Sequence, residues 1–134
     1  MDEMVFLNGV LLPRSQARIS VMDYGFLYGY GLFETMRAYE GKVFLLERHL
    51  ARLANGAGRL GFSVASLDLS AAVKAVLHAN GMKNARVRIT ASIGEGAMTP
   101  DPQTCQKPTI LIVAAEYHPP PESVYQTGYR MMVS

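Results

Sequence analysis

Residues 86–93, Arg86-Val87-Arg88-Ile89-Thr90-Ala91-Ser92-Ile93, alternate basic or hydroxylated side chains with apolar ones without interruption. Successive side chains of a β-strand point to opposite faces of its sheet, so the four apolar residues share one face and the four polar residues share the other. This period of two predicts a strand with one buried face and one polar face.

Two amphipathic helices are predicted on the N-terminal side of this strand. The first is marked by apolar residues that step by four, three, four and three positions, namely Leu46, Leu50, Leu53, Ala57 and Leu60. Gly61 suits the C-terminal cap of this helix, and Asn80-Gly81 suits the end of a second helix over residues 67–80. Arg48, Arg52 and Arg59 fall together on another side of the first helix.

Further strands are predicted at both ends of this region. Apolar runs at residues 4–7 and 10–12 flank Asn8-Gly9, a pair that tolerates the positive φ of a hairpin turn. Residues 33–39 alternate up to Glu40-Gly41 and are followed by a short strand at residues 43–46. Residues 109–115 are almost continuously apolar after a proline-containing loop, which predicts a central strand buried on both faces.

These elements indicate an α+β fold, a mostly antiparallel sheet with two helices packed on one face. Residues 1–118 are expected to form one small N-terminal α+β domain. The triple proline at residues 119–121 favours an extended linker, and residues 129–133 alternate like the start of a strand. We therefore expect residues 119–134 to form a linker and a first strand that lead into a C-terminal domain missing from this chain.

Composition gives little indication of a macromolecular partner. The net charge is +2, from 13 basic and 11 acidic residues that are interspersed, so neither nucleic acid nor a membrane surface is expected as a partner. The longest apolar run, residues 110–115, is too short to span a bilayer, and the single Cys105 is read as an inert loop thiol. A cytoplasmic location is the expectation.

Residues 23–35 place glycines between aromatic residues directly before a predicted strand. Such a stretch suits either a small-molecule cleft or a merely structural glycine loop. Arg37 and Arg88 lie on polar strand faces, where they could form an anion site or simply face solvent. No histidine cluster has metal-ligand spacing, so no metal site is expected, and no glycine-rich loop with a following lysine indicates a nucleotide.

Four linked motifs together resemble the opening of class IV (fold-type IV) pyridoxal-phosphate enzymes, the branched-chain and D-amino-acid aminotransferases and aminodeoxychorismate lyases. They are the Asn-Gly hairpin, Asp23-x-Gly25-x-x-Tyr28-Gly29-x-Gly31-x-Phe33-Glu34, Arg37-x-Tyr39-x-Gly41, and His49-x-x-Arg52-Leu53. The resemblance implies pyridoxal 5′-phosphate as cofactor, an amino acid or 2-oxo acid as substrate, and a homodimer.

The resemblance also assigns roles to individual residues. Arg52 matches the arginine that binds the cofactor phosphate. Tyr28 and Phe33 match positions that line the substrate pocket, while Arg37 and Arg88 match positions near the substrate carboxylate or the polar wall of that pocket. Catalysis in the family requires a lysine bonded to the cofactor, and none of the lysines of this chain matches it, namely Lys42, Lys74, Lys83 and Lys107.

No catalytic residue is therefore expected within these 134 residues, and the chain alone is expected to be inactive and not to retain the cofactor. The leading interpretation is the N-terminal part of an aminotransferase that moves amino groups between an amino acid and a 2-oxo acid. An aminodeoxychorismate lyase of 4-aminobenzoate and folate synthesis is an alternative within the enzymes. A non-catalytic module that binds a small carboxylate or another subunit is the alternative of a different class.

Overall fold

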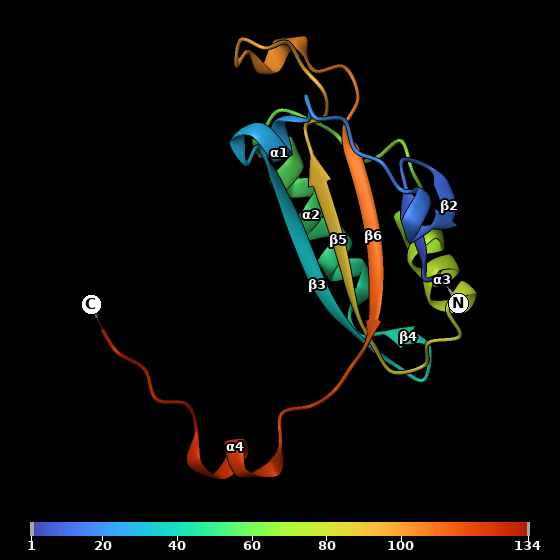
Figure 1. The fold of residues 1–134 in the computed structure, drawn as a ribbon, viewed down its shortest axis with the longest axis vertical. Helices are drawn as coiled ribbons and strands as arrows, with labels where there is room; N and C mark the ends of the chain where they lie inside the picture. Colours follow the sequence, from blue (N-terminus) through green and yellow to red (C-terminus); the bar gives the residue numbers. More distant parts are fainter. Residues whose placement is uncertain (1, 134) are drawn as a thin grey trace.

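A computed structural model describes residues 2–133, which form a six-stranded antiparallel sheet in the order β2-β1-β6-β5-β3-β4 (Figure 1). The strands are β1 (Met4–Leu7), β2 (Val10–Pro13), β3 (Gly31–Tyr39), β4 (Lys42–Val43), β5 (Ala85–Ser92) and β6 (Thr109–Glu116). The helices are α1 (Tyr24–Tyr28), α2 (Leu46–Arg59), α3 (Leu69–Ala79) and α4 (Glu122–Thr127), with short 3-10 turns at Arg14–Gln16 and Pro102–Thr104.

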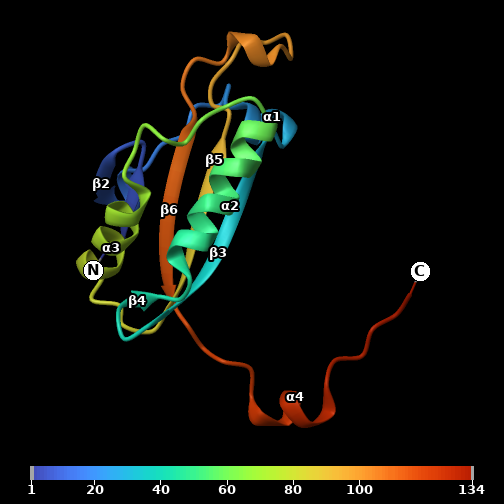
Figure 2. The same cartoon turned by 180° about the vertical axis from the view of Figure 1, so that it is seen from behind.

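Helices α2 and α3 cover one face of the sheet, as the view from behind shows (Figure 2). The core lies between these helices and the sheet, because the inward residues of the strands are fully buried against the helical stripes. Its strand residues include Met36, Val87, Ile89, Ile110 and Ile112. The predicted α+β fold with two helices on one face is confirmed, and β5 lies within one residue of the predicted strand.

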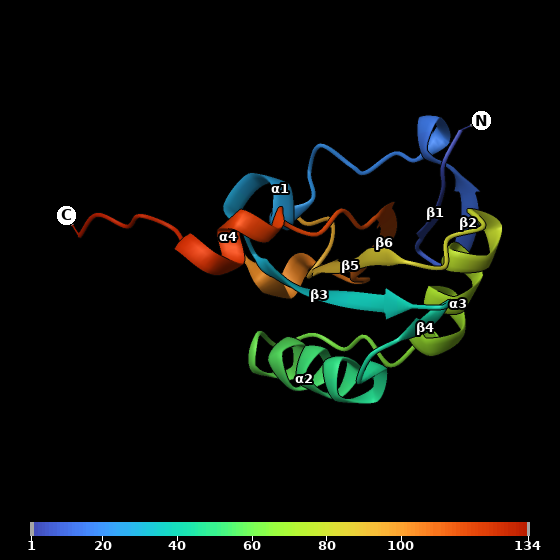
Figure 3. The ribbon, with the colours of Figure 1, turned by 90° about the horizontal axis from the view of Figure 1, so that it is seen from below.

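The opposite face of the sheet carries the segment of residues 17–23 and α1 at one end, and no other element within residues 2–133 covers it (Figure 3). We call it the open face. Along β3 and β5 it presents Phe33, Thr35, Arg37, Arg86 and Arg88, which alternate with the core residues. One set of strands thus builds an apolar core on one side and a polar, aromatic surface on the other.

Both predicted tight turns have the positive φ angles that their residues tolerate. Asn8 and Gly9 have φ of 50° and 96°, and Leu7 pairs with Val10 across the turn. Glu40 and Gly41 have φ of 47° and 76° between β3 and β4. Each turn fixes the register of its hairpin, which decides which side chains face the core.

Three expectations differ from the structure. The strand expected at residues 43–46 is only Lys42–Val43, because Leu45 adopts a φ of 52° and caps α2 instead. Strand β6 is buried on its helix-facing side and only half-buried on the open face, since no second layer of residues 2–133 covers it there. The stretch before β3 contains α1, a short helix that the glycine pattern did not predict.

The C-terminal segment also differs from the expectation. Residues 122–127 form α4, and residues 128–133 have no regular structure, so no strand begins at Tyr129. Strand hydrogen bonds need a neighbouring strand, and the sheet offers none to this segment, which leaves β6 and extends away from the sheet (Figure 1). Ser134 lies outside the described residues, and the domain boundary at residue 118 stays a prediction.

Candidate functional site

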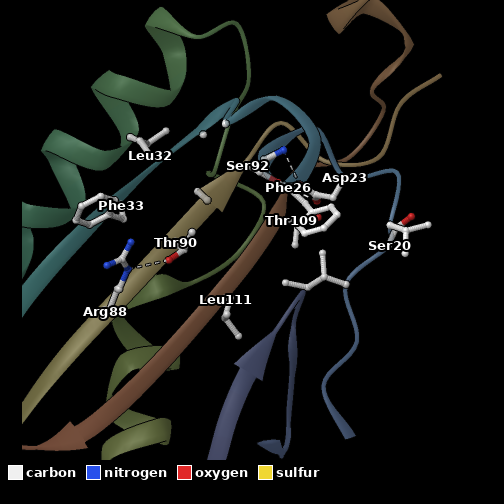
Figure 4. Close-up of a pocket in the computed structure, with 16 residues that line it drawn as sticks. Ser20, Asp23, Phe26, Leu32, Phe33, Arg88, Thr90, Ser92, Thr109 and Leu111 are labelled. Atoms are coloured by element: carbon white, nitrogen blue, oxygen red, sulfur yellow. Dashed lines mark hydrogen bonds between the residues drawn. The ribbon is translucent and has the colours of Figure 1, made fainter. Parts of the chain in front are cut away.

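A cleft of about 670 Å³ lies on the open face, between the segment of residues 19–29 and the ends of β3, β5 and β6 (Figure 4). Thr90 and Leu111 line it from the strands, together with Phe26, Phe33 and Arg88 among others. Most of these side chains are apolar or aromatic, with a few polar groups among them, which is the usual composition of a small-molecule site.

A buried carboxylate holds the glycine-rich wall of this cleft against β5. Asp23, which is 2% exposed, caps α1 by accepting a hydrogen bond from the Gly25 N–H at 2.7 Å. The Ser92 hydroxyl donates to the same carboxylate, with oxygen distances of 2.7 and 2.9 Å. A Cβ at Gly25 would lie 2.6 Å from the Ser92 Cβ, and one at Gly31 would lie 2.6 Å from the Ala91 carbonyl oxygen. Gly25 and Gly31 are therefore required for the close packing of this wall, and both also line the cleft.

The tyrosines of α1 fasten the loop of residues 94–104 to this wall. The Tyr24 side chain is 1% exposed, and its hydroxyl lies 2.7 Å from both the Ala97 and the Thr99 carbonyl oxygens. Tyr28 packs edge-on against Tyr24 and donates to the Met98 carbonyl at 3.0 Å. Tyr28 is not among the residues that line the cleft, so the structure places it beside the expected pocket and not within it.

Phe33 and Arg88 are the two expected site residues that the structure brings together. The Arg88 guanidinium lies 3.8 Å from the centroid of the Phe33 ring, and its Nε donates to the Thr90 hydroxyl at 3.3 Å (Figure 4). The one acidic residue in the lining, Asp23, already accepts hydrogen bonds from Ser92 and Gly25. The guanidinium is thus oriented by an aromatic face while its charge is left for a ligand.

Arg37 lies farther along β3 and outside the cleft. Its guanidinium stacks on two tyrosines, 4.6 Å from the Tyr39 centroid and 3.7 Å from the Tyr117 centroid. These residues border a smaller depression of about 260 Å³ on the same open face, together with Thr35 and Arg86. The structure therefore separates Arg37 from Arg88, although both lie on polar strand faces as expected.

Arg52 lies on α2, on the other side of the sheet from the cleft. Its Nε and Nη2 donate to both carboxylate oxygens of Glu34, at 2.5 and 2.6 Å. His49 Nδ1 lies 2.8 Å from the second of these oxygens and donates to it, because an ionised carboxylate can only accept. The hydrogen bond from Arg52 holds the pKa of Glu34 below its ordinary value, against the opposing effect of burial, and His49 adds to the lowering. The same contact raises the pKa of Arg52.

Glu34 was not among the site residues expected from the sequence. Its position in the sequence could have indicated a role, because alternation places this acidic residue with Met36 and Ala38 on the face of β3 that packs against the helices. A carboxylate at such a position needs an ion pair or hydrogen-bond donors in the folded chain. The His49-x-x-Arg52 spacing on α2 supplied them.

Arg52 and the Arg88–Phe33 pair flank one edge of the sheet. Strand β4 pairs only with Ala38 and Tyr39, so among residues 2–133 no strand covers the outer edge of β3 from residue 31 to residue 36. Helix α2 lies below this edge and the open face lies above it (Figure 3). A ligand at the edge could therefore contact the basic helix side and the cleft together.

The helix side of this edge fits a phosphate group. Arg52 is 72% exposed despite its pairing with Glu34, and it borders a shallow depression with Arg48, Arg59, Asn55 and Gly56. No acidic residue lines the depression among the described residues. Three guanidinium groups around a shallow surface form a site for a dianion, since arginine pairs bidentately with phosphate.

Comparison with known proteins identifies the family. The sequence profile described as Amino-transferase class IV matches residues 31–134. The chain belongs to the class IV aminotransferase family, whose members are pyridoxal-phosphate enzymes.

Individual relatives span several activities. The chain is 36% identical to the aminodeoxychorismate lyase of Bacillus subtilis over 120 residues, which cover 87% of this chain and 41% of the relative. It is 32% identical to the D-alanine aminotransferase of Staphylococcus haemolyticus over 123 residues, covering 87% and 42%.

A solved structure has the same fold. The branched-chain aminotransferase of the thermophilic archaeon Thermoproteus uzoniensis, crystallised with norvaline, superposes with a TM-score of 0.76 at 29% identity, covering 88% of this chain and 42% of that one. The chain thus spans about two-fifths of the length of the proteins it matches.

Other features of the described residues concern membranes, metals and reactive groups. No helix within residues 2–133 is both long and apolar enough to cross a membrane, and no group of three or more His, Cys, Asp or Glu side chains there is arranged to hold a metal ion. Burial, followed by the nearby charge of Asp23, raises the pKa of the Cys105 thiol, which disfavours the reactive thiolate. None of the residues that line the cleft, all within residues 19–111, is a lysine.

Proposed function

We propose that the protein containing this chain is a pyridoxal-phosphate-dependent aminotransferase that exchanges amino groups between an amino acid and a 2-oxo acid. The observation that supports this most directly is the Arg88 guanidinium held 3.8 Å above the Phe33 ring in the cleft. Such an arrangement suits a substrate with a carboxylate next to an apolar side chain, because the guanidinium pairs with the carboxylate and the ring contacts the apolar part.

In this proposal the residues of the chain divide the ligand between them. Arg52 holds the phosphate of the cofactor, Arg88 orients the substrate carboxylate, and Phe33 borders the substrate side chain. Arg37 is proposed to bind a more distant polar group of the substrate, and Tyr28 to border the pocket through α1. Bound pyridoxal phosphate supplies the aldehyde carbon that takes up and releases the amino group.

We further propose that the reactive lysine is contributed by a segment that follows residue 134. The proteins that match this chain are more than twice its length, and the cleft-lining residues include no lysine. The longest gene product should therefore be titrated with pyridoxal phosphate and followed by its visible absorption, before and after borohydride.

The expected result is a cofactor band that borohydride abolishes, together with a phosphopyridoxyl mass increment on a lysine beyond residue 134. If the complete product shows neither the band nor the increment, the proposal fails and a non-catalytic carboxylate-binding or subunit-interaction module takes its place.

An aminodeoxychorismate lyase is the second candidate, supported by the 36% identity to the Bacillus subtilis lyase. Product analysis separates the two activities. Release of pyruvate and 4-aminobenzoate from aminodeoxychorismate would identify a lyase, and amino exchange with 2-oxoglutarate would identify an aminotransferase.

We also propose that the full protein is a homodimer. Large apolar side chains are exposed near the cleft and in the adjoining loop, including Val21 at 73%, Phe26 at 75% and Met98 at 78%. Exposed apolar groups clustered around one site are typical of a surface that another chain covers. Light scattering of the full-length protein tests this, with twice the monomer mass as the expected result.

A further inference from the structure

Glu34 is a charged side chain in the layer where strands and helices form the core. It is 5% exposed, lies opposite Ile89 on β5, and shares its face of β3 with Leu32 and Met36. Removing a carboxylate from water costs free energy that an apolar residue of similar size would not. The fold alone therefore gives no reason for an acid at this position.

The partners of Glu34 make the geometry unusual. Arg52 contributes two parallel N–H groups to its carboxylate, and His49 contributes a third from one turn earlier on α2. His49 is 21% exposed, whereas the Arg52 side chain is 72% exposed. A long and mostly solvated side chain is thus held in one orientation by a buried anchor.

Helix α2 approaches β3 closely at this point. A Cβ at Gly56 would lie 2.8 Å from the Leu32 Cδ1, so the glycine allows the helix to rest on the strand one turn after Arg52. This spacing brings the guanidinium within reach of the Glu34 carboxylate. Arg52 Nη1 has no hydrogen-bond partner among residues 2–133, and it lies at the depression that Arg48 and Arg59 border.

A stabilising role does not account for this arrangement. Buried ion pairs contribute little net stability compared with apolar residues of similar volume, because both ions lose water. Here the cation stays mostly in water, so holding it costs side-chain conformational freedom as well. What the pairing does provide is a guanidinium whose orientation is fixed before a ligand arrives, and preorganisation of that kind increases affinity.

We propose that Glu34 is a positioning residue that fixes Arg52 for the phosphate of the cofactor, with His49 fixing the carboxylate in turn. This inference rests on the proposed function, since it takes the ligand at Arg52 to be a phosphate ester. Neutralising Glu34 frees Arg52 to rotate and weakens binding of the phosphate while leaving binding of the rest of the cofactor unchanged.

The test measures the contribution of the phosphate directly, without any assay of turnover. Binding of the fluorescent ligands pyridoxamine 5′-phosphate and pyridoxamine to the full-length protein is compared, and the ratio of the two dissociation constants is the phosphate preference. Glu34→Gln is expected to reduce this preference about tenfold, the size of effect typical of groups that orient a ligating side chain.

Three further variants make the result specific. Glu34→Asp keeps the charge but shortens the side chain, so it lowers the preference even if Glu34→Gln fails to fold. Glu47→Gln removes the same charge from an exposed position on α2 that does not contact Arg52, and it leaves the preference unchanged. In an Arg52→Ala background, Glu34→Gln has no additional effect on the preference.

The failures of the two proposals are distinguishable. If the wild-type protein binds neither ligand, the proposed function fails and the role of Glu34 fails with it. If Arg52→Ala abolishes the phosphate preference while the Glu34 variants retain it, the proposed function stands and the positioning role is overturned. Equal weakening of both ligands by the Glu34 variants would also overturn it, because that pattern indicates a general loss of structure.

Discussion

The same three long strands, β3, β5 and β6, build both faces of the sheet, and the charged side chains on the two faces have different kinds of partner. On the helix-covered face of β3, the carboxylate of Glu34 is anchored by an ion pair with Arg52 and a hydrogen bond from His49. On the open face, Arg37 and Arg88 rest on aromatic rings and have no ion-pair partner within residues 2–133.

This difference indicates which charged groups are paired within the chain and which are available to a ligand. The helix-covered face buries the apolar core, and its one charged cluster pairs Glu34 internally while the Arg52 side chain stays mostly exposed. The open face leaves its guanidinium groups for ligands, since an aromatic ring orients an arginine without neutralising it. Changes to the apolar core residues and to the guanidinium groups of the open face should therefore separate stability from binding.

The largest expected effect on stability comes from truncating the core side of β6. Ile112 is 0% exposed, and Ile112→Ala is expected to lower the free energy of unfolding by about 2–5 kcal/mol, because it leaves a cavity between sheet and helices. Leu111 is its neighbour on the open face, where it lines the cleft. Leu111→Ala should cost less than about 1 kcal/mol in urea unfolding of residues 1–134. Equal losses would show that the open face is covered like a core.

A smaller effect is expected at the border of the open face. Tyr24→Phe keeps the ring but removes the hydroxyl that holds the loop of residues 94–104, at a cost of about 0.5–1.5 kcal/mol, since the part-buried hydrogen bonds to the Ala97 and Thr99 carbonyls are lost. Hydrogen exchange should show faster exchange in this loop. Tyr125→Phe, on the exposed α4, is the matched control and should leave the loop unchanged.

Features that depend on local sequence patterns could be predicted, whereas contacts between distant segments could not. Alternation at residues 86–93, the stripe of α2 and the Asn8-Gly9 turn depend on local periodicity and backbone preference, and the structure confirms all three. The bonds from Tyr24 to residues 97 and 99 join segments more than 70 positions apart, so no local pattern contains them. Side-chain pairings such as Arg88 with Phe33 depend in the same way on strand register.

The site was predictable in part for the same reason. Arg88 and Phe33 were expected as site residues and do share the cleft, whereas Tyr28 and Arg37 lie just outside it. Glu34 was missed because its partners are on α2, 15 and 18 positions later. The strand expected after residue 128 is absent from the described residues, since strand pairing needs a neighbour that this segment lacks.

Acid is expected to weaken the Glu34–Arg52 contact on the helix-covered face. The pKa of Glu34 is lowered in the folded chain from its ordinary value of 4.5. The folded state therefore stabilises the ionised carboxylate relative to the unfolded state. Its contribution to stability is complete well above pH 4.5 and is lost as the pH falls through the lowered pKa. Urea unfolding from neutral pH downward measures this loss, and Glu34→Gln should flatten the profile in that range. An unchanged profile in the variant would assign acid sensitivity to other carboxylates.

The smallest expected effect on stability, and the largest on binding, comes from the open face. Arg88→Leu should change the free energy of unfolding by less than about 0.5 kcal/mol, because the side chain is exposed and has no carboxylate partner within residues 2–133. Binding of a carboxylate substrate to the full-length protein should nevertheless weaken about 10- to 100-fold, the effect of losing a charged hydrogen bond.

Two variants sharpen this last prediction. Arg88→Lys keeps the charge but loses the planar fork, so it should recover only part of the affinity. Arg86→Leu removes the same charge from the same face of β5 at a position outside the cleft, and it should leave substrate binding nearly unchanged. If Arg86→Leu and Arg88→Leu weaken binding equally, the open face acts through its overall positive charge, and the specific contact at Phe33 does not determine recognition.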